Sequence, residues 1–156
     1  ICLGMTQETL QSVCAACGGV NRIPSRRLSA ASAAKCGKCG ARLFSGAADP
    51  VSAEIFQRSI ERSDVPLLVD FWAPWCGPCR SLAPAVEAVA GRLSPSARVL
   101  KLNIDEAQDI AQRLGIRSIP TLAVFVGGRE AARTSGVMSE QALAGWAKSV
   151  LDRSTV

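Results

Sequence analysis

The most informative stretch of this chain is Pro66-Leu67-Leu68-Val69-Asp70-Phe71-Trp72-Ala73-Pro74-Trp75-Cys76-Gly77-Pro78-Cys79. Its first half is a short run that is apolar at nearly every position, a pattern typical of a strand buried on both faces. Its second half places two thiols three residues apart, where that strand would pass into a helix. A Cys-x-x-Cys pair in this setting indicates reversible dithiol–disulfide chemistry. The stretch therefore predicts a redox site at the end of a buried strand.

After residue 50, strand-like and helix-like apolar patterns alternate, as they do in an α/β domain. The expected helices span 52–62, 79–93, 107–114 and a last segment from Ser139 to Leu151. The expected strands span 67–72, 98–103, 121–126 and 129–134, and one more within 44–51 would make a fifth. Asp105 is expected to cap the third helix, and Gly127-Gly128 to form a two-residue hairpin turn. These elements predict a mixed sheet, parallel first and then antiparallel.

Two further Cys-x-x-Cys pairs lie in the first forty residues, Cys14/Cys17 and Cys36/Cys39, separated by eighteen residues. This spacing is typical of a four-cysteine zinc site, and the chain has no histidine. A glycine after the second cysteine of each pair permits the turn that points backbone N–H groups at sulfur. We expect one closed, structural zinc ion. An iron or other metal site and a pair of disulfides remain alternatives.

The segment 45–50 is small and turn-rich, and we expect the domain boundary there. Residues 1–48 would form an N-terminal zinc-binding module and residues 49–156 the larger domain. Met5 is a candidate natural start, so residues 1–4 are either native chain or a remnant added before it. Cys2 receives no role.

The formal net charge of +5 lies entirely in residues 1–48, which hold six basic side chains and one acid, Glu8. A basic patch of this kind can bind nucleic acid or an acidic protein. However, four thiolates on one zinc ion would reduce the module's charge to about +3. Only Phe44 in this module could stack on a base, so nucleic acid is a disfavoured partner.

No segment approaches the length of about 18 apolar residues that a membrane-spanning helix needs. The N-terminus also lacks the charged and apolar pattern of a secretory signal. We therefore expect a protein of the cytoplasm that does not associate with membranes, although a mature chain with its signal removed would look the same.

Residues 50–153 resemble thioredoxin, and with the cysteine-rich module the whole chain is similar to the zinc-containing thioredoxin 2 type of bacteria. The blocks that carry the resemblance are 69–73, 75–79, 101–105, Ile119-Pro120-Thr121 and the Gly127-Gly128 hairpin. The resemblance implies a thioredoxin fold, in which helices flank a central mixed β-sheet, with a zinc-ribbon-like module in front of it.

The residues themselves indicate the chemistry of the Cys-x-x-Cys pair. Cys76 lies at a helix start, where free N–H groups and the helix dipole favour a thiolate nucleophile. Cys79, held beside it, can resolve a mixed disulfide at high effective concentration. Pro78 suits the first turn of a helix, and Gly77 allows a substrate backbone to approach closely. The alternatives for this pair are a metal half-site and a plain structural disulfide.

Asp70 is the one polar residue of its apolar run, and burial should raise the pKa of its carboxyl group. It could then accept the proton of Cys79, which is the role that the resemblance implies for it. The resemblance also implies that Lys101 couples to this aspartate. The alternatives are an aspartate that reaches solvent at a strand end and a surface lysine.

The resemblance assigns the remaining site residues. Pro120 matches a cis-proline opposite the disulfide, which leaves the backbone of Ile119 free to pair with an extended substrate. The apolar docking surface corresponds to Trp75, Gly77, Pro78, Ile104, Ile119, Gly136 and Val137. For Ile104 and Val137, ordinary packing is an equal alternative, and Trp72 is expected to support the active-site turn.

The leading functional hypothesis is a protein disulfide reductase that acts on disulfide-containing proteins and binds no organic cofactor. NADPH-dependent thioredoxin reductase would restore its dithiol. An oxidant or isomerase of an oxidising compartment is a second hypothesis. A zinc-ribbon adaptor that binds nucleic acid or an acidic protein is a third. A redox switch in which oxidation ejects zinc is a fourth and is compatible with the first.

Overall fold

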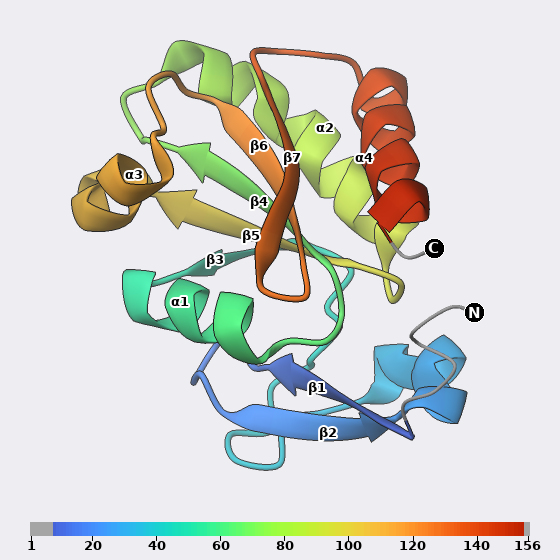
Figure 1. Cartoon of the computed structure of the whole chain (residues 1–156). Helices are drawn as coiled ribbons and strands as arrows, with labels where there is room; N and C mark the ends of the chain where they lie inside the picture. Colours follow the sequence, from blue (N-terminus) through green and yellow to red (C-terminus); the bar gives the residue numbers. More distant parts are fainter. Residues whose placement is uncertain (1–7, 155–156) are drawn as a thin grey trace.

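The computed structural model describes residues 8–154, apart from the side chains of 29–32, and shows a five-stranded sheet between helices with a small two-stranded unit beside it (Figure 1). Its strands are β1 (Thr9–Val13), β2 (Val20–Pro24), β3 (Ala48–Val51), β4 (Leu67–Trp72), β5 (Arg98–Asn103), β6 (Thr121–Val126) and β7 (Arg129–Ser135). Its helices are α1 (Ala53–Arg62), α2 (Gly77–Leu93), α3 (Gln108–Leu114) and α4 (Glu140–Ser154), with 3₁₀ turns η2 (Ser25–Ala33) and η3 (Ile104–Glu106). Within residues 8–154, no helix is both long and apolar enough to span a bilayer.

The strands of the large sheet lie in the order β3-β5-β4-β6-β7. The pairs β3/β5 and β5/β4 are parallel, and β4/β6 and β6/β7 are antiparallel. This confirms the predicted mixed sheet, including its fifth strand. The apolar run Leu67–Trp72 forms the central strand because its alternate side chains can be buried on both faces at once.

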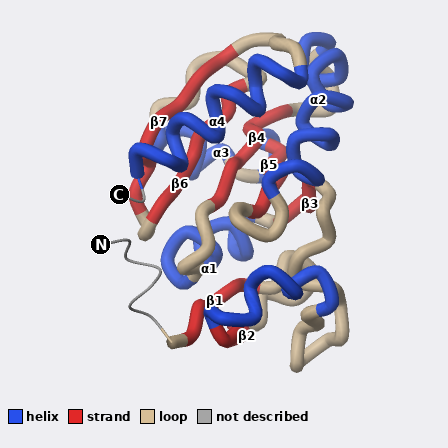
Figure 2. The backbone as a smooth tube through the Cα atoms, turned by 90° about the vertical axis from the view of Figure 1, so that its right-hand side faces the viewer, coloured by secondary structure: helices blue, strands red, loops and turns tan. Residues whose placement is uncertain are grey.

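Two apolar cores lie on the two faces of this sheet. On one face, α2 and α4 pack on Leu68, Val99 and Leu122. On the other, Phe56 of α1 and Ile110 of α3 pack on a set of strand residues that includes Val69 and Phe71. Figure 2 shows α2 and α4 next to each other across one face. Because side chains alternate along a strand, Asp70 belongs to the α2/α4 face, with Leu68.

Local sequence signals set most of the element ends. The Ser52 and Ser139 hydroxyls accept hydrogen bonds from Ile55 N at 3.2 Å and Ala142 N at 3.1 Å, as expected of N-cap residues. Gly127 and Gly128 have φ values of 60° and 83° and join β6 to β7 with Val126 opposite Arg129, so the hairpin prediction is confirmed.

Two expectations were wrong in detail. Helix α2 starts at Gly77, two residues earlier than predicted, because the Cys76 side chain acts as its N-cap. Asp105 does not cap α3: it lies in η3, and Ala107 precedes α3 without any side-chain cap hydrogen bond. The Asp105 carboxylate is engaged elsewhere, with Trp75.

The two-stranded unit packs against α1 and the start of β5 (Figures 1 and 2). Arg98, the first residue of β5, is only 4% exposed, and its guanidinium donates to Ser12 Oγ at 3.0 Å and to the Val13 carbonyl. It also lies 3.7 Å from the Asp49 carboxylate. Asp64 accepts a hydrogen bond from Gln11 N at 2.7 Å. These contacts fix the N-terminal module to the edge of the sheet where β5 begins.

Replacing Arg98 tests whether this contact holds the two units together. Arg98→Met would remove the donors to Ser12 and Val13, and loss of one side of a buried polar network costs about 2–4 kcal/mol. The matched control is Arg92→Met, since Arg92 pairs with Glu140 at 3.3 Å on the surface. That exposed pair should contribute at most about 1 kcal/mol. Urea unfolding measures both losses, and equal losses would contradict a special role for Arg98.

Candidate functional site

The two thiols of the Cys-x-x-Cys pair lie at the N-terminus of α2, directly beyond the end of β4. Cys76 and Cys79 are joined by a disulfide, and each is 4% exposed. Cys76 is the N-cap of α2, and its Sγ accepts a hydrogen bond from the Cys79 N–H at 3.1 Å. An anionic sulfur at this position is stabilised by that N–H and by the helix dipole.

A second loop lies against this pair. Cys76 Sγ is 3.8 Å from the Ile119 carbonyl oxygen, and the Ile119–Pro120 peptide bond is cis. The Pro120 carbonyl accepts a hydrogen bond from Gly136 N at 3.0 Å. Cys76 and Cys79 are in contact with three partly buried side chains, those of Trp72, Ile104 and Ile119. The fold therefore brings together residues from three separate predicted blocks around one disulfide.

Two of the expected docking residues are strongly exposed at the rim of the site. Trp75 is 67% exposed and Val137, next to Gly136, is 54% exposed. The Trp75 ring is held in place by its Nε1–H, which donates to Asp105 Oδ2 at 3.0 Å. Sequence reasoning missed this role of Asp105. The signal that could have found it is the position of Asp105 just after β5, at the same sheet edge as the end of β4.

Asp70 lies in the middle of β4, in register with Lys101 of β5 on one side and Leu122 of β6 on the other. It is 2% exposed, which excludes an aspartate that reaches solvent. Burial raises the pKa of Asp70 to about 6, and the charge of Lys101 offsets part of that rise. Within the described residues, Asp70 Oδ1 has no hydrogen-bond partner. The carboxyl group is thus poised to exchange a proton near neutral pH.

The half-buried Lys101 does not make a direct ion pair with Asp70: among the described residues no salt bridge within 4.0 Å joins them. Its ammonium instead lies over the Trp72 ring, 4.6 Å from the centroid. The structure therefore places Lys101 beside the carboxylate but in contact with an aromatic face.

The other four cysteines of the described chain, Cys14, Cys17, Cys36 and Cys39, form a second cluster in the N-terminal module. Their sulfur atoms all lie within 4.8 Å of one another, and none forms a disulfide. The Sγ distances are 3.7 Å for Cys14–Cys39 and 3.6 Å for Cys17–Cys36. Four sulfurs at about 2.3 Å from a tetrahedral zinc ion would be about 3.8 Å apart, so the donor set fits zinc.

The backbone around these cysteines is arranged for anionic sulfur. Gly18 and Gly40 adopt φ values of 77° and 83°, which non-glycine residues rarely adopt. Gly19 N lies 3.3 Å from Cys17 Sγ, and Lys38 N lies 3.4 Å from Cys36 Sγ. A hydrogen bond from the Asn21 amide is the main cause that lowers the pKa of Cys36 to about 6. The cluster thus has the N–H···S contacts that thiolate ligands need.

The two cysteine sites lie at opposite ends of β5. Arg98, at its start, contacts Val13 beside Cys14, whereas Asp105, just after its end, contacts Trp75 beside Cys76. A six-residue strand spans about 20 Å. A metal in the N-terminal module could not touch a substrate disulfide at Cys76.

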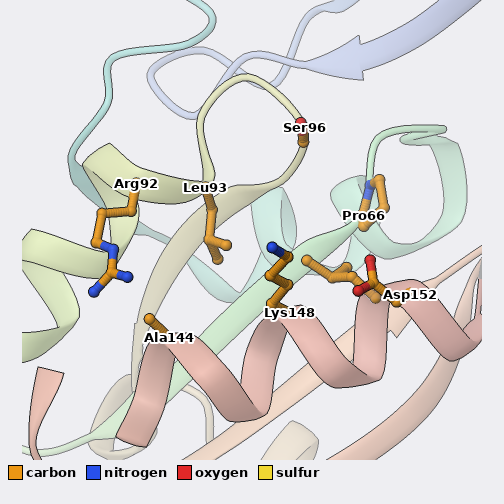
Figure 3. A pocket seen from close by; sticks show the side chains of 8 residues that line it. Pro66, Arg92, Leu93, Ser96, Ala144, Lys148 and Asp152 are labelled. Atoms are coloured by element: carbon orange, nitrogen blue, oxygen red, sulfur yellow. The ribbon is translucent and has the colours of Figure 1, made fainter. Parts of the chain in front are cut away.

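A separate cavity of about 420 Å³ lies between α4 and the end of α2 (Figure 3). Its lining residues are Pro66, Arg92, Leu93, Ser96, Ala144, Lys148, Leu151 and Asp152. Pro66 precedes β4, whereas Cys76 follows it, so the cavity lies at the opposite end of the sheet from the disulfide. It contributes no cysteine and is not part of the redox site.

The raised pKa of Asp70 predicts how the stability of the folded protein depends on pH. Because the folded-state pKa exceeds the unfolded value, the folded protein holds a proton that the unfolded chain releases, and stability falls as pH rises from the ordinary aspartate value to about 6. Above that range the cost is about 3 kcal/mol. Asp70→Asn should therefore stabilise the oxidised protein by up to that amount near pH 8. Urea unfolding below about pH 3.5 should show no difference, and a stabilisation that persists there would contradict burial of a charge as the cause.

Comparison with known proteins agrees with this geometry. The thioredoxin family profile matches residues 48–149, and the profile of the N-terminal zinc ribbon of thioredoxin 2 matches residues 13–41. Thioredoxin 1 from Nostoc sp. is 45% identical over 97 residues, which are 62% of this chain and 91% of that protein. Thioredoxin from Synechocystis sp. is 45% identical over 94 residues, 60% of this chain and 88% of that protein.

Among solved structures, a mutant thioredoxin from Halobacterium salinarum NRC-1 is similar with a TM-score of 0.51 and 38% identity, covering 56% of this chain and 76% of that one. The two family profiles match two separate parts of the chain. The chain therefore belongs to the thioredoxin family of thiol–disulfide oxidoreductases and carries an N-terminal zinc ribbon of the thioredoxin 2 type.

Proposed function

We propose that the chain reduces protein disulfides with Cys76 as the attacking residue and Cys79 as the resolving residue. The observation that carries this assignment is the position of Cys76 Sγ at the N-cap of α2, where it accepts the Cys79 N–H at 3.1 Å. Cys79 lies inside the first turn of the helix, and its own N–H is the donor to Cys76 Sγ. The thiol at the helix start is therefore the better-stabilised anion.

The exchange takes place in two balanced steps. The Cys76 thiolate attacks one substrate sulfur, a Cys76–substrate bond forms, the substrate S–S bond breaks, and the released thiolate takes up a proton. Cys79 then loses its proton and attacks Cys76 Sγ. The Cys76–Cys79 disulfide forms, the mixed disulfide breaks, and the second substrate thiolate leaves and is protonated. Two electrons and two protons pass to the substrate.

Asp70 serves as the proton acceptor for Cys79 in this scheme. Its burial on the α2 side of the sheet and its pKa of about 6 support the role. A carboxyl group with a pKa near the working pH can both take and return a proton. Lys101 tunes the charge of Asp70 from the neighbouring strand.

Substrate binds, in this proposal, as an extended segment over the disulfide. Pro120 has no N–H, and the Ile119 backbone beside Cys76 is available to pair with such a segment. An apolar rim around the disulfide would contact the side chains of this segment. The rim is formed by Trp75, Gly77, Pro78, Ile104, Gly136 and Val137. The exposure of Trp75 and Val137 supports this surface.

One zinc ion would be held, with no open coordination position, by Cys14, Cys17, Cys36 and Cys39. The ion would therefore supply folding energy rather than chemistry.

We further infer that NADPH-dependent thioredoxin reductase restores the Cys76–Cys79 dithiol and that the protein works in a reducing compartment such as the cytoplasm. The unpaired thiols of the four-cysteine cluster support this inference. The nucleic-acid adaptor is less well supported, because Phe44 is 1% exposed and cannot stack on a base.

The roles of the two thiols can be separated by trapping. Cys79→Ser should accumulate a mixed disulfide between Cys76 and a disulfide substrate such as insulin, because no thiol is left to resolve it. Cys76→Ser should trap far less, since the Cys79 thiol does not hold the N-cap position that stabilises a thiolate. Mass spectrometry of the quenched reaction identifies the linked cysteine. A larger yield of substrate adduct on Cys79 in the second variant would reverse the assignment.

The zinc assignment predicts one zinc ion per chain by atomic spectroscopy. Cys36→Ser should lose most of that zinc and unfold the N-terminal module, because the site supplies its folding energy. The thiol–disulfide exchange of Cys76 and Cys79 should persist. Cys2→Ser is the matched control and should keep its zinc. Full zinc content in Cys36→Ser would contradict a four-cysteine site.

A further inference from the structure

Three side chains of the redox site share the sheet face that α2 covers: Asp70 and Trp72 on β4, and Lys101 on β5. Lys101 is in direct register with Asp70, whereas Trp72 is in register with Asn103, the residue two positions further on. The direct cross-strand neighbour of the ammonium group is therefore the carboxylate. Nevertheless the ammonium lies over the Trp72 ring, 4.6 Å from its centroid, and makes no ion pair with Asp70 within 4.0 Å among the described residues.

Two buried polar atoms of these side chains have no hydrogen-bond partner within the described residues. Asp70 Oδ1 is buried without a hydrogen-bond partner in the described part of the chain, so it could accept a bond from the ammonium. The Trp72 Nε1–H is buried without a partner as well. The indole is thus not oriented by a hydrogen bond of its own, and the ring face is its polar contact, through the attraction of a cation to the aromatic quadrupole.

We propose that Trp72 is a positioning residue for the exchange reaction, which holds the Lys101 ammonium on its ring face and away from the Asp70 carboxylate. The inference rests on the proposed role of Asp70 as proton acceptor for Cys79. It adds a specific function to a tryptophan that also packs, partly buried, beside Cys76 and Cys79.

The consequence concerns the affinity of Asp70 for a proton. Burial raises the pKa of Asp70 to about 6, and Lys101 at its present position only partly opposes this. A direct, hydrogen-bonded ammonium would stabilise the carboxylate much more strongly. The carboxylate would then be a weaker base toward the Cys79 thiol. Trp72 thus preserves the basicity on which the resolving step depends.

Few other charged groups face Asp70. Strand β6 is Thr121–Val126 and carries no charge. From α2 the titratable groups on the inner side are the thiols of Cys76 and Cys79, while Arg80, Glu87 and Arg92 are on its exposed side. The charged residues of α4 are likewise not buried. Lys101 is therefore the ammonium group that can change the titration of Asp70 through a local rearrangement.

The test is an NMR titration of the Asp70 ¹³Cγ resonance in the oxidised protein with its zinc. Trp72→Leu removes the ring face and should raise the acid dissociation constant of Asp70 about tenfold, because Lys101 then pairs with the carboxylate. Trp72→Phe keeps a weaker aromatic face and should show a smaller rise. In a Lys101→Met background, Trp72→Leu should change the constant less than twofold, or about 0.4 kcal/mol.

An unchanged or lowered dissociation constant in Trp72→Leu would overturn the inference, and so would an equal rise with Lys101 absent. If the leucine variant does not fold, the phenylalanine variant decides: no rise in it overturns the inference. The proposed role of Asp70 is tested separately, by the pH dependence of mixed-disulfide resolution in Asp70→Asn. An unchanged profile there would refute the proton-acceptor role while leaving the titration result intact.

Discussion

The main physical constraint on the redox face of the sheet is a carboxyl group, that of Asp70, buried in the central strand. Strand β4 has partners on both edges and apolar cores on both faces, so Asp70 is only 2% exposed. Burial of an ionised carboxylate is costly, and the cost appears as a raised pKa. A carboxyl group whose pKa is about 6 can take up and release a proton near neutral pH, and this one lies on the sheet face that α2 covers. Lys101 lies beside it on β5, while the Ile119–Pro120 loop packs on the disulfide at the start of α2.

Strand β5 connects this site to the zinc ribbon. Its first residue, Arg98, is buried against Ser12 and Val13 of the module, and Lys101 three residues later faces Asp70. Asp105, in the 3₁₀ turn η3 that follows β5, holds the exposed ring of Trp75. One strand about 20 Å long thus has the zinc ribbon at its start and the redox site at its end. The N-terminal module can stabilise the redox domain without sharing its chemistry.

The sequence predicts much of this fold because its signals are local and periodic. The buried run 67–72, the Gly127-Gly128 turn and the Ser52 and Ser139 caps each act within a few residues. Strands β1 and β2 were not predicted, since five-residue strands in a cysteine-rich module have no clear period. The start of α2 was misplaced because cysteine is an unusual N-cap.

Long-range contacts were the other part that could not be predicted. The bond from Trp75 to Asp105 joins residues 30 positions apart, and Asp105 looked like a helix cap. In the sequence Arg98 is an ordinary strand residue, and its burial comes from contact with the N-terminal module, where its partner Val13 lies 85 positions away. The preference of Lys101 for the Trp72 ring over Asp70 depends on side-chain positions that no periodicity encodes. Such pairings between distant residues supply the details that convert a recognisable motif into a working site.

If a reducing dithiol at the start of α2 works beside an inert zinc ribbon, the two cysteine sites must respond separately to the redox potential. A glutathione redox titration of the zinc-loaded protein measures both responses, with tryptophan fluorescence and released zinc recorded together. We expect a midpoint for the Cys76–Cys79 pair near −270 mV, about the value of a reducing thioredoxin, with zinc retained throughout. A midpoint above about −200 mV would show that the dithiol is not reducing, and zinc released over the same range of potential would show that the ribbon is not inert.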